Sequence, residues 1–132
     1  MTPKLYHLAK HYPCSLVCVA LICILSLTPF FPETPFDNVA FIDKWTHFVM
    51  YGGTCAVIWW EHVRHTQPSR HQSMLHFSLT TILFLVALGG LMELLQAYCT
   101  TTRSGEWLDF WADSFGTLLG TLVGLAYYRF RR

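Results

Sequence analysis

The chain has 132 residues, of which 53% are hydrophobic and 13% are charged, and its formal net charge is +1. This length has room for one domain, but a soluble domain of this size would need more charged residues to cover its surface. The composition therefore predicts an integral membrane protein, and the lack of a long basic run argues against a nucleic-acid partner.

The cysteines do not form a metal-binding pattern, because none of them is spaced Cys-x-x-Cys or combined with histidine as zinc sites require. They are Cys14, Cys18, Cys23, Cys55 and Cys99, and four of them lie in apolar segments. We expect them to be small buried hydrophobic residues.

Apolar runs follow one another along the chain at about residues 14–31, 43–61, 74–98 and 108–128. Each is close to the roughly 20 residues that a membrane-spanning helix needs. Because backbone groups in hydrocarbon must be hydrogen-bonded internally, these runs should be helices. A cleaved signal peptide is the alternative for the first run, but no small-x-small cleavage site follows it. The predicted fold is all-α, a single domain over residues 1–132 that forms a four-helix transmembrane bundle.

Lysine and arginine are distributed unevenly between the connections of these runs. The N-terminal arm, the second connection and the C-terminus are rich in them, whereas the first and third connections carry one each. Cytoplasmic loops of membrane proteins carry an excess of lysine and arginine. We therefore expect both termini to be cytoplasmic, and the first and third connections to lie outside.

Polar side chains gather near the outer ends of the last three predicted helices. They are Asp43, Lys44 and His47 on the second helix, Glu93 and Gln96 on the third, Asp109 and Asp113 on the fourth, and Arg103 in the loop before it. Spacings of three or four residues place the members of each group on one helical face. At a rise of 1.5 Å per residue, the deeper members lie roughly 5–8 Å below the helix ends. If these faces turn away from lipid, they meet in a site at the outer leaflet.

Structural roles are alternatives for the outermost of these residues. Asp43 and Asp109 could cap the helices that they begin. Lys44 could reach lipid head groups, and Arg103 could hold a lipid phosphate. Gln96 could join two helices by a hydrogen bond.

His47, Glu93 and Asp113 are the strongest candidates, because each lies about one turn inside the membrane, where ionisable side chains are costly. A purely structural polar network is the alternative for these three. The other histidines lie at or beyond the cytoplasmic ends of the runs, where we expect solvated or interfacial roles.

Glycines recur every four residues in the last run, at Gly116, Gly120 and Gly124. Such spacing lets another helix approach closely. Gly89 or the pair at residues 52–53 could receive this face within the bundle. The same face could instead join two copies of the chain in a homo-oligomer.

The polar and glycine motifs follow a definite order along the chain. They are Asp43-Lys44-x-x-His47, Glu93-x-x-Gln96, Arg103-Ser104-Gly105, Asp109, Asp113 and Gly116-x-x-x-Gly120. This order resembles the VanZ-like membrane protein family over about residues 41–125. The resemblance implies a small four-helix protein of the bacterial inner membrane, in a family whose founding member is associated with teicoplanin resistance. Position 113 is commonly Asn in that family and is Asp here, so a role that depends on an amide does not transfer directly.

An enzyme acting on a lipid or a lipid-linked cell-envelope precursor is one hypothesis for such a site. Histidine suits proton transfer near neutral pH, and two neighbouring carboxylates cannot both ionise freely, which provides an acid and a base. The residues predicted to be catalytic are His47, Glu93, Asp109 and Asp113, and those predicted to bind substrate are Asp43, Lys44, Gln96 and Arg103.

Three alternatives stay open beside the enzyme. The site could bind or flip a lipid head group without chemistry, or it could be a structural network. A divalent cation could bind there as a cofactor, with His47, Glu93, Asp109 and Asp113 as its ligands, although their spacing is not specific for a metal.

Overall fold

The computed structural model describes residues 2–28, 35, 41–66, 74–101 and 105–131, and all regular secondary structure within them is helical. The helices are α1 (Pro3–His11), α2 (Pro13–Leu27), α3 (Ile42–His65), α4 (Met74–Cys99) and α5 (Trp107–Arg131). The predicted all-α class is therefore confirmed for these parts of the chain.

The N-terminal region differs from its prediction. α1 has no counterpart among the apolar runs, because charged and apolar residues alternate along it. Proline stands at the start of both α1 and α2, where a helix does not need the missing N–H, and the two helices are bent by 95° relative to each other. α2 ends at Leu27 rather than at residue 31, and Thr28 is extended.

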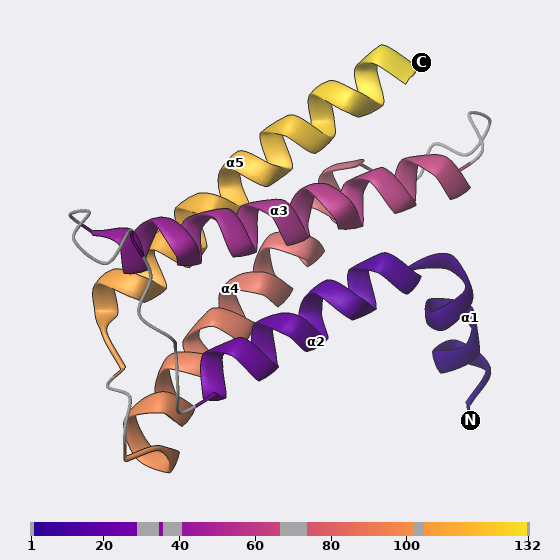
Figure 1. Cartoon of the computed structure of the whole chain (residues 1–132). Coiled ribbons are helices and arrows are strands. Elements are labelled where there is room, and N and C mark those ends of the chain that lie inside the picture. The colour runs from indigo at the N-terminus through magenta and orange to yellow at the C-terminus, as the bar shows by residue number, and fades with distance from the viewer. Residues whose placement is uncertain (1, 29–34, 36–40, 67–73, 102–104, 132) are drawn as a thin grey trace.

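Helices α2 to α5 run alternately in opposite directions, so that α3 lies parallel to α5 (Figure 1). The contact between α3 and α5 is the most extensive in the molecule. It depends on glycines: a Cβ on Gly116 would collide with the backbone oxygen of Phe48, and one on Gly120 would lie 2.6 Å from the oxygen of Gly52. The predicted close approach therefore occurs within one chain, between α3 and α5. A homo-oligomer through the same face stays a prediction.

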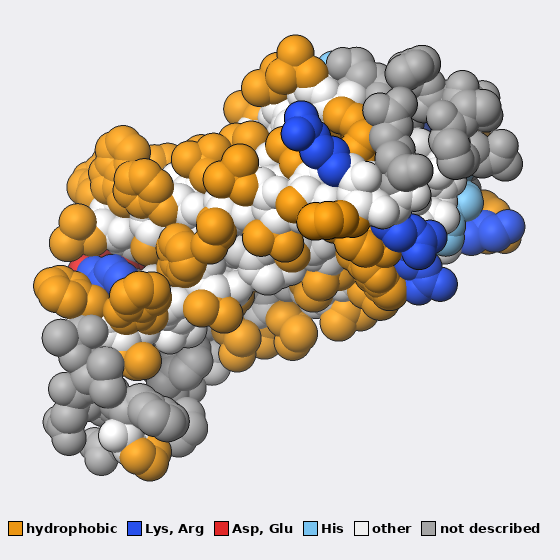
Figure 2. All heavy atoms as spheres, turned by 90° about the horizontal axis from the view of Figure 1, so that it is seen from above, with side chains coloured by type: hydrophobic (Ala, Val, Ile, Leu, Met, Phe, Trp, Pro, Cys, Tyr) orange, Lys and Arg blue, Asp and Glu red, His pale blue; other side chains and the backbone are white. Residues whose placement is uncertain are grey.

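The described surface is apolar along the length of the helices. α4 is the one described helix long and apolar enough to cross a membrane by itself, with a mean hydropathy of 2.0, and only 33% of that stretch is buried inside the molecule. α1 and α2 meet the same criterion only as a bent pair. Figure 2 shows hydrophobic side chains spread over the visible face, with most of its lysines and arginines toward the end that carries the termini.

The interior is comparatively polar. Among the described residues, fourteen polar or charged side chains are buried, against seven hydrophobic ones. An apolar exterior around a polar interior is the opposite of what water favours. Polar side chains of membrane helices usually face the interior of the bundle, so this arrangement is compatible with helices in lipid.

Candidate functional site

The parallel packing of α3 on α5 places their first turns side by side. His47 lies one turn into α3, and Asp109 and Asp113 lie in the first two turns of α5. Because Gly116 lets the two backbones touch just beyond these residues, their side chains face one another across a short distance.

His47 lies between the two aspartates of α5. Its Nδ1 is 2.8 Å from Oδ1 of Asp113, and the two atoms share a hydrogen bond. Its Nε2 is 3.7 Å from Oδ2 of Asp109. The exposed fractions are 5% for His47, 3% for Asp109 and 0% for Asp113. The bond to Asp113 fixes the ring and leaves Nε2 to gain or lose a proton on the side of Asp109.

Lys44 is surrounded by carboxylates. Its Nζ lies 3.1 Å from Asp109, 3.5 Å from Asp43 and 2.5 Å from Glu106. This arrangement leaves little of its positive charge for an anionic substrate. Glu106 was not among the predicted site residues, although it lies three residues before Asp109 and so near the same helical face.

Glu93 approaches the same cluster from α4. Its Oε2 accepts a hydrogen bond of 2.8 Å from the backbone N–H of Glu106, while its Oε1 has no hydrogen-bond partner among the described residues. Ligand atoms of His47, Glu93 and Asp113 lie within 4.8 Å of one another, and so do those of Asp43, His47 and Asp109. The structure therefore brings together every predicted catalytic residue, with Lys44 and Asp43 at the edge.

The remaining predicted site residues lie differently. Gln96 is 1% exposed and its amide donates a hydrogen bond of 2.7 Å to the backbone oxygen of Ser26 on α2. It thus joins α4 to α2, as the structural alternative for Gln96 predicts. Asp43 lies in the first turn of α3, whereas the N-cap position is Phe41, which makes no side-chain capping hydrogen bond. Arg103 lies outside the described residues.

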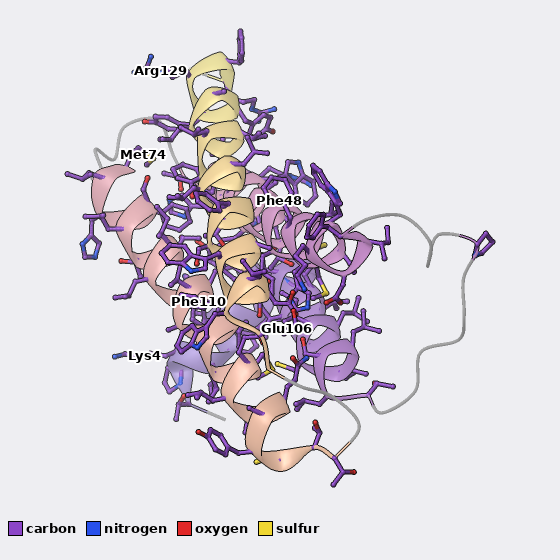
Figure 3. The ribbon with its side chains drawn as sticks, turned by 90° about the vertical axis from the view of Figure 1, so that its left-hand side faces the viewer. Lys4, Phe48, Met74, Glu106, Phe110 and Arg129 are labelled. Atoms are coloured by element: carbon purple, nitrogen blue, oxygen red, sulfur yellow. The ribbon has the colours of Figure 1, made fainter. Side chains whose placement is uncertain are left out.

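A cavity of about 300 Å³ lies beside the cluster, between the end of α4 and the beginning of α5. Its lining residues are Gly90, Glu93, Leu94, Ala97, Tyr98, Gly105, Glu106, Trp107 and Phe110. In Figure 3, Phe110 points toward α4 and Glu106 lies on the side of α3. Glu93 is the one lining residue that also belongs to the buried cluster, so it connects the cavity with His47 and Asp113.

A second polar cluster, not predicted, lies at the opposite end of the bundle. Glu61 of α3 accepts hydrogen bonds from the backbone N–H groups of Cys14 and Ser15, at 2.8 and 2.9 Å, and from the hydroxyl of Ser15. It therefore caps the first turn of α2 from another helix. His62 is buried rather than solvated and shares a hydrogen bond of 2.7 Å with the hydroxyl of Tyr12. The sequence signal was Glu61 itself, an acid at the end of an apolar run.

No protein-family model matches the chain, no curated protein is significantly similar to it in sequence, and no solved structure matches it. The resemblance to the VanZ-like family therefore stays a prediction based on its motifs.

Proposed function

We propose that this chain is a multi-pass protein of the bacterial inner membrane, in which α2, α3, α4 and α5 each cross the bilayer. Their alternating directions, apolar exterior and polar interior support this arrangement. The lysine and arginine distribution supports an orientation with both termini in the cytoplasm and the cluster around His47 near the outer leaflet.

The function that the site supports best is action on the polar group of an amphiphile, a lipid or a lipid-linked cell-envelope precursor. His47 would move protons between that group and its carboxylate partners, while the cavity would hold an apolar part of the same molecule. The VanZ-like resemblance agrees with an envelope function and extends the proposal to glycopeptide resistance of the teicoplanin type.

The observation that carries this proposal is the position of Glu93. A network that only joins helices would pair every buried carboxylate and leave no cavity. Instead, Glu93 has one oxygen without a partner among the described residues, and it lines a cavity beside His47 and Asp113. Unpaired buried acids in a membrane helix are costly, which favours a functional role.

A non-catalytic protein that binds or flips head groups is the second candidate. The mostly apolar lining of the cavity favours binding, because it offers a surface for an acyl or prenyl chain. Flipping would need a polar path toward the other leaflet. Below Asp113, the buried polar side chains of α5 are Thr117 and Thr121, whose hydroxyls donate to oxygens of their own helix. These hydroxyls are therefore not free to form such a path along α5.

Lipid analysis of cells that express wild type, Glu93→Gln or His47→Ala tests the catalytic proposal. His65→Ala, which removes an exposed histidine from the far end of the same helix, is the matched control. Relative to cells without the protein, we expect wild type and the control to change the level of at least one phospholipid or lipid-linked precursor. The two site variants should leave that level unchanged. Equal levels of every such lipid in all four strains, at equal protein abundance, would show that the catalytic proposal is wrong.

A further inference from the structure

Two groups of side chains in the site are close enough together to hold a metal ion, and they share His47. One group adds Asp43 and Asp109, and the other adds Glu93 and Asp113. Within each group, one ligand atom from each residue lies within 4.8 Å of the others. The two groups differ in the charge that already compensates their carboxylates.

Lys44 supplies that charge in the first group. Its ammonium group lies 3.1 Å from Asp109 and 3.5 Å from Asp43. A metal ion there would have to compete with a resident cation. Asp43 is also exposed, so part of its charge is screened by water.

The second group has no such compensation. Among the described residues, no lysine or arginine forms an ion pair with Glu93 or Asp113, and His47 is the only basic side chain in contact with Asp113. Oε1 of Glu93 and Oδ2 of Asp113 are both buried and have no hydrogen-bond partner among these residues. The exposed fractions are 8% and 0%, so water does not replace the missing partners at the surface.

Tyr51 adds a further polar atom to this region. It follows His47 by four residues and therefore lies one turn deeper on the same face of α3. The residue is 0% exposed, and its hydroxyl oxygen has no hydrogen-bond partner among the described residues. Tyr51, Glu93 and Asp113 thus bring three buried polar atoms from three helices to this end of the bundle, each without a hydrogen-bond partner among the described residues.

We propose that His47, Glu93 and Asp113 bind one first-row divalent cation, of the Mn²⁺ or Zn²⁺ type. One imidazole nitrogen combined with carboxylate oxygens suits these ions, whereas Ca²⁺ takes six to eight oxygen ligands and Mg²⁺ prefers oxygen ligands and water. The ion would neutralise the buried carboxylates and occupy their free oxygens. This inference rests on the proposed function in that it assigns a ligand to the same site, but it assumes no reaction.

Binding of the metal alone to the purified full-length protein tests the inference. The protein in lipid nanodiscs is treated with EDTA, Mn²⁺ is titrated, and the loss of the free Mn²⁺ electron paramagnetic resonance signal is measured. Zn²⁺, Mg²⁺ and Ca²⁺ are then used as competitors. We expect one saturable Mn²⁺ site per chain that Zn²⁺ displaces and that Ca²⁺ at equal concentration does not.

Variants locate the ion. Glu93→Gln and Asp113→Asn should each weaken Mn²⁺ binding by at least about tenfold, because each removes a charged ligand. Asp43→Asn, which belongs only to the first group, should bind like wild type. Absence of saturable binding to wild type below about 1 mM overturns the inference whatever the variants do. So does loss of binding in Asp43→Asn together with unchanged binding in Glu93→Gln.

The metal measurement and the lipid analysis fail independently. A chain that binds no cation but needs Glu93 for a lipid change keeps the proposed function and loses this inference. A chain that binds Mn²⁺ through Glu93 and changes no lipid keeps this inference and loses the catalytic proposal.

Discussion

Two buried glutamates lie at opposite ends of the bundle and differ in what surrounds them. Glu61 is 3% exposed and both of its oxygens accept hydrogen bonds from the beginning of α2. Glu93 is 8% exposed, but only one of its oxygens accepts a hydrogen bond among the described residues. Burial alone therefore does not distinguish a structural acid from a functional one. What distinguishes them is whether the fold satisfies the carboxylate.

The two ends also depend on different helix pairs. Glu61 joins α3 to α2, whereas the cluster around His47 needs α3 and α5 in close contact. Changes that act on one pair should therefore leave the other end intact, which allows the comparison to be tested.

Gly116→Ala should have the largest effect. The new Cβ would collide with the backbone oxygen of Phe48, which cannot rotate away, so α3 and α5 must separate. Overpacking of this kind costs about 3 kcal/mol of stability. The free energy of unfolding in detergent measures the loss, and Mn²⁺ binding reports the damage to the site.

Gly53→Ala is the matched control, because a Cβ at Gly53 would meet nothing within 4 Å. It should stabilise α3 by about 0.5–1 kcal/mol, as expected for alanine in place of glycine in a helix. Equal destabilisation by both variants would mean that the close contact at Gly116 does not hold the two helices together.

Glu61→Gln should have the next largest effect and should separate the two glutamates directly. An amide keeps one acceptor oxygen, so one of the two α2 backbone donors loses its partner, at a cost of about 1–3 kcal/mol. Glu93→Gln should change stability by less than about 0.5 kcal/mol or raise it, because it removes an uncompensated charge. Unfolding midpoints of the two variants give the comparison, and a larger loss for Glu93→Gln would reverse the assignment of roles.

Lys44→Met should have a smaller effect than the loss of the Glu61 cap. It removes the cation next to Asp109, which is buried, but Lys44 and Glu106 are partly exposed and their pair is screened by water. We expect a loss of about 1 kcal/mol. The double variant with Glu106→Gln should lose less than the sum of the two single changes, because the two residues interact directly. Strict additivity would show that this ion pair contributes nothing.

Much of this arrangement could be predicted from the sequence, because the signals are local. Long apolar runs predict the helices, and spacings of three or four residues place His47, Asp109 and Asp113 on faces that meet in the structure. The glycine spacing predicts a close helix contact. It does not identify the partner helix, since Gly52 and Gly89 were equally suitable candidates.

The missed features depend on contacts between distant residues. The capping of α2 by Glu61 joins positions 46 and 47 residues apart, so an acid at the end of an apolar run does not reveal which helix it caps. Gln96 lies three residues after Glu93, a spacing that places both on one helical face and predicts a shared site. The amide of Gln96 instead donates to a backbone oxygen on α2. α1 was missed because it is only nine residues long and has two lysines and two histidines among its apolar residues, so it does not form an apolar run.

A pH change should have the smallest and most local effect, at the end that carries Glu61. His11 of α1 lies outside the apolar spans and packs against His65, with ring centroids 4.9 Å apart. Burial, together with the charges of His7, His65 and Lys10, lowers the pKa of His11 below its ordinary value of 6.5. The unfolded or undocked segment therefore binds a proton more readily than the docked one, and docking of α1 should weaken as the pH falls below about 6.5.

Hydrogen exchange of the α1 backbone at pH 7.5 and 5.5, corrected for the intrinsic rate, measures this weakening. His11→Gln should abolish the difference between the two pH values. Retained pH dependence of α1 exchange in His11→Gln would assign the effect to another group.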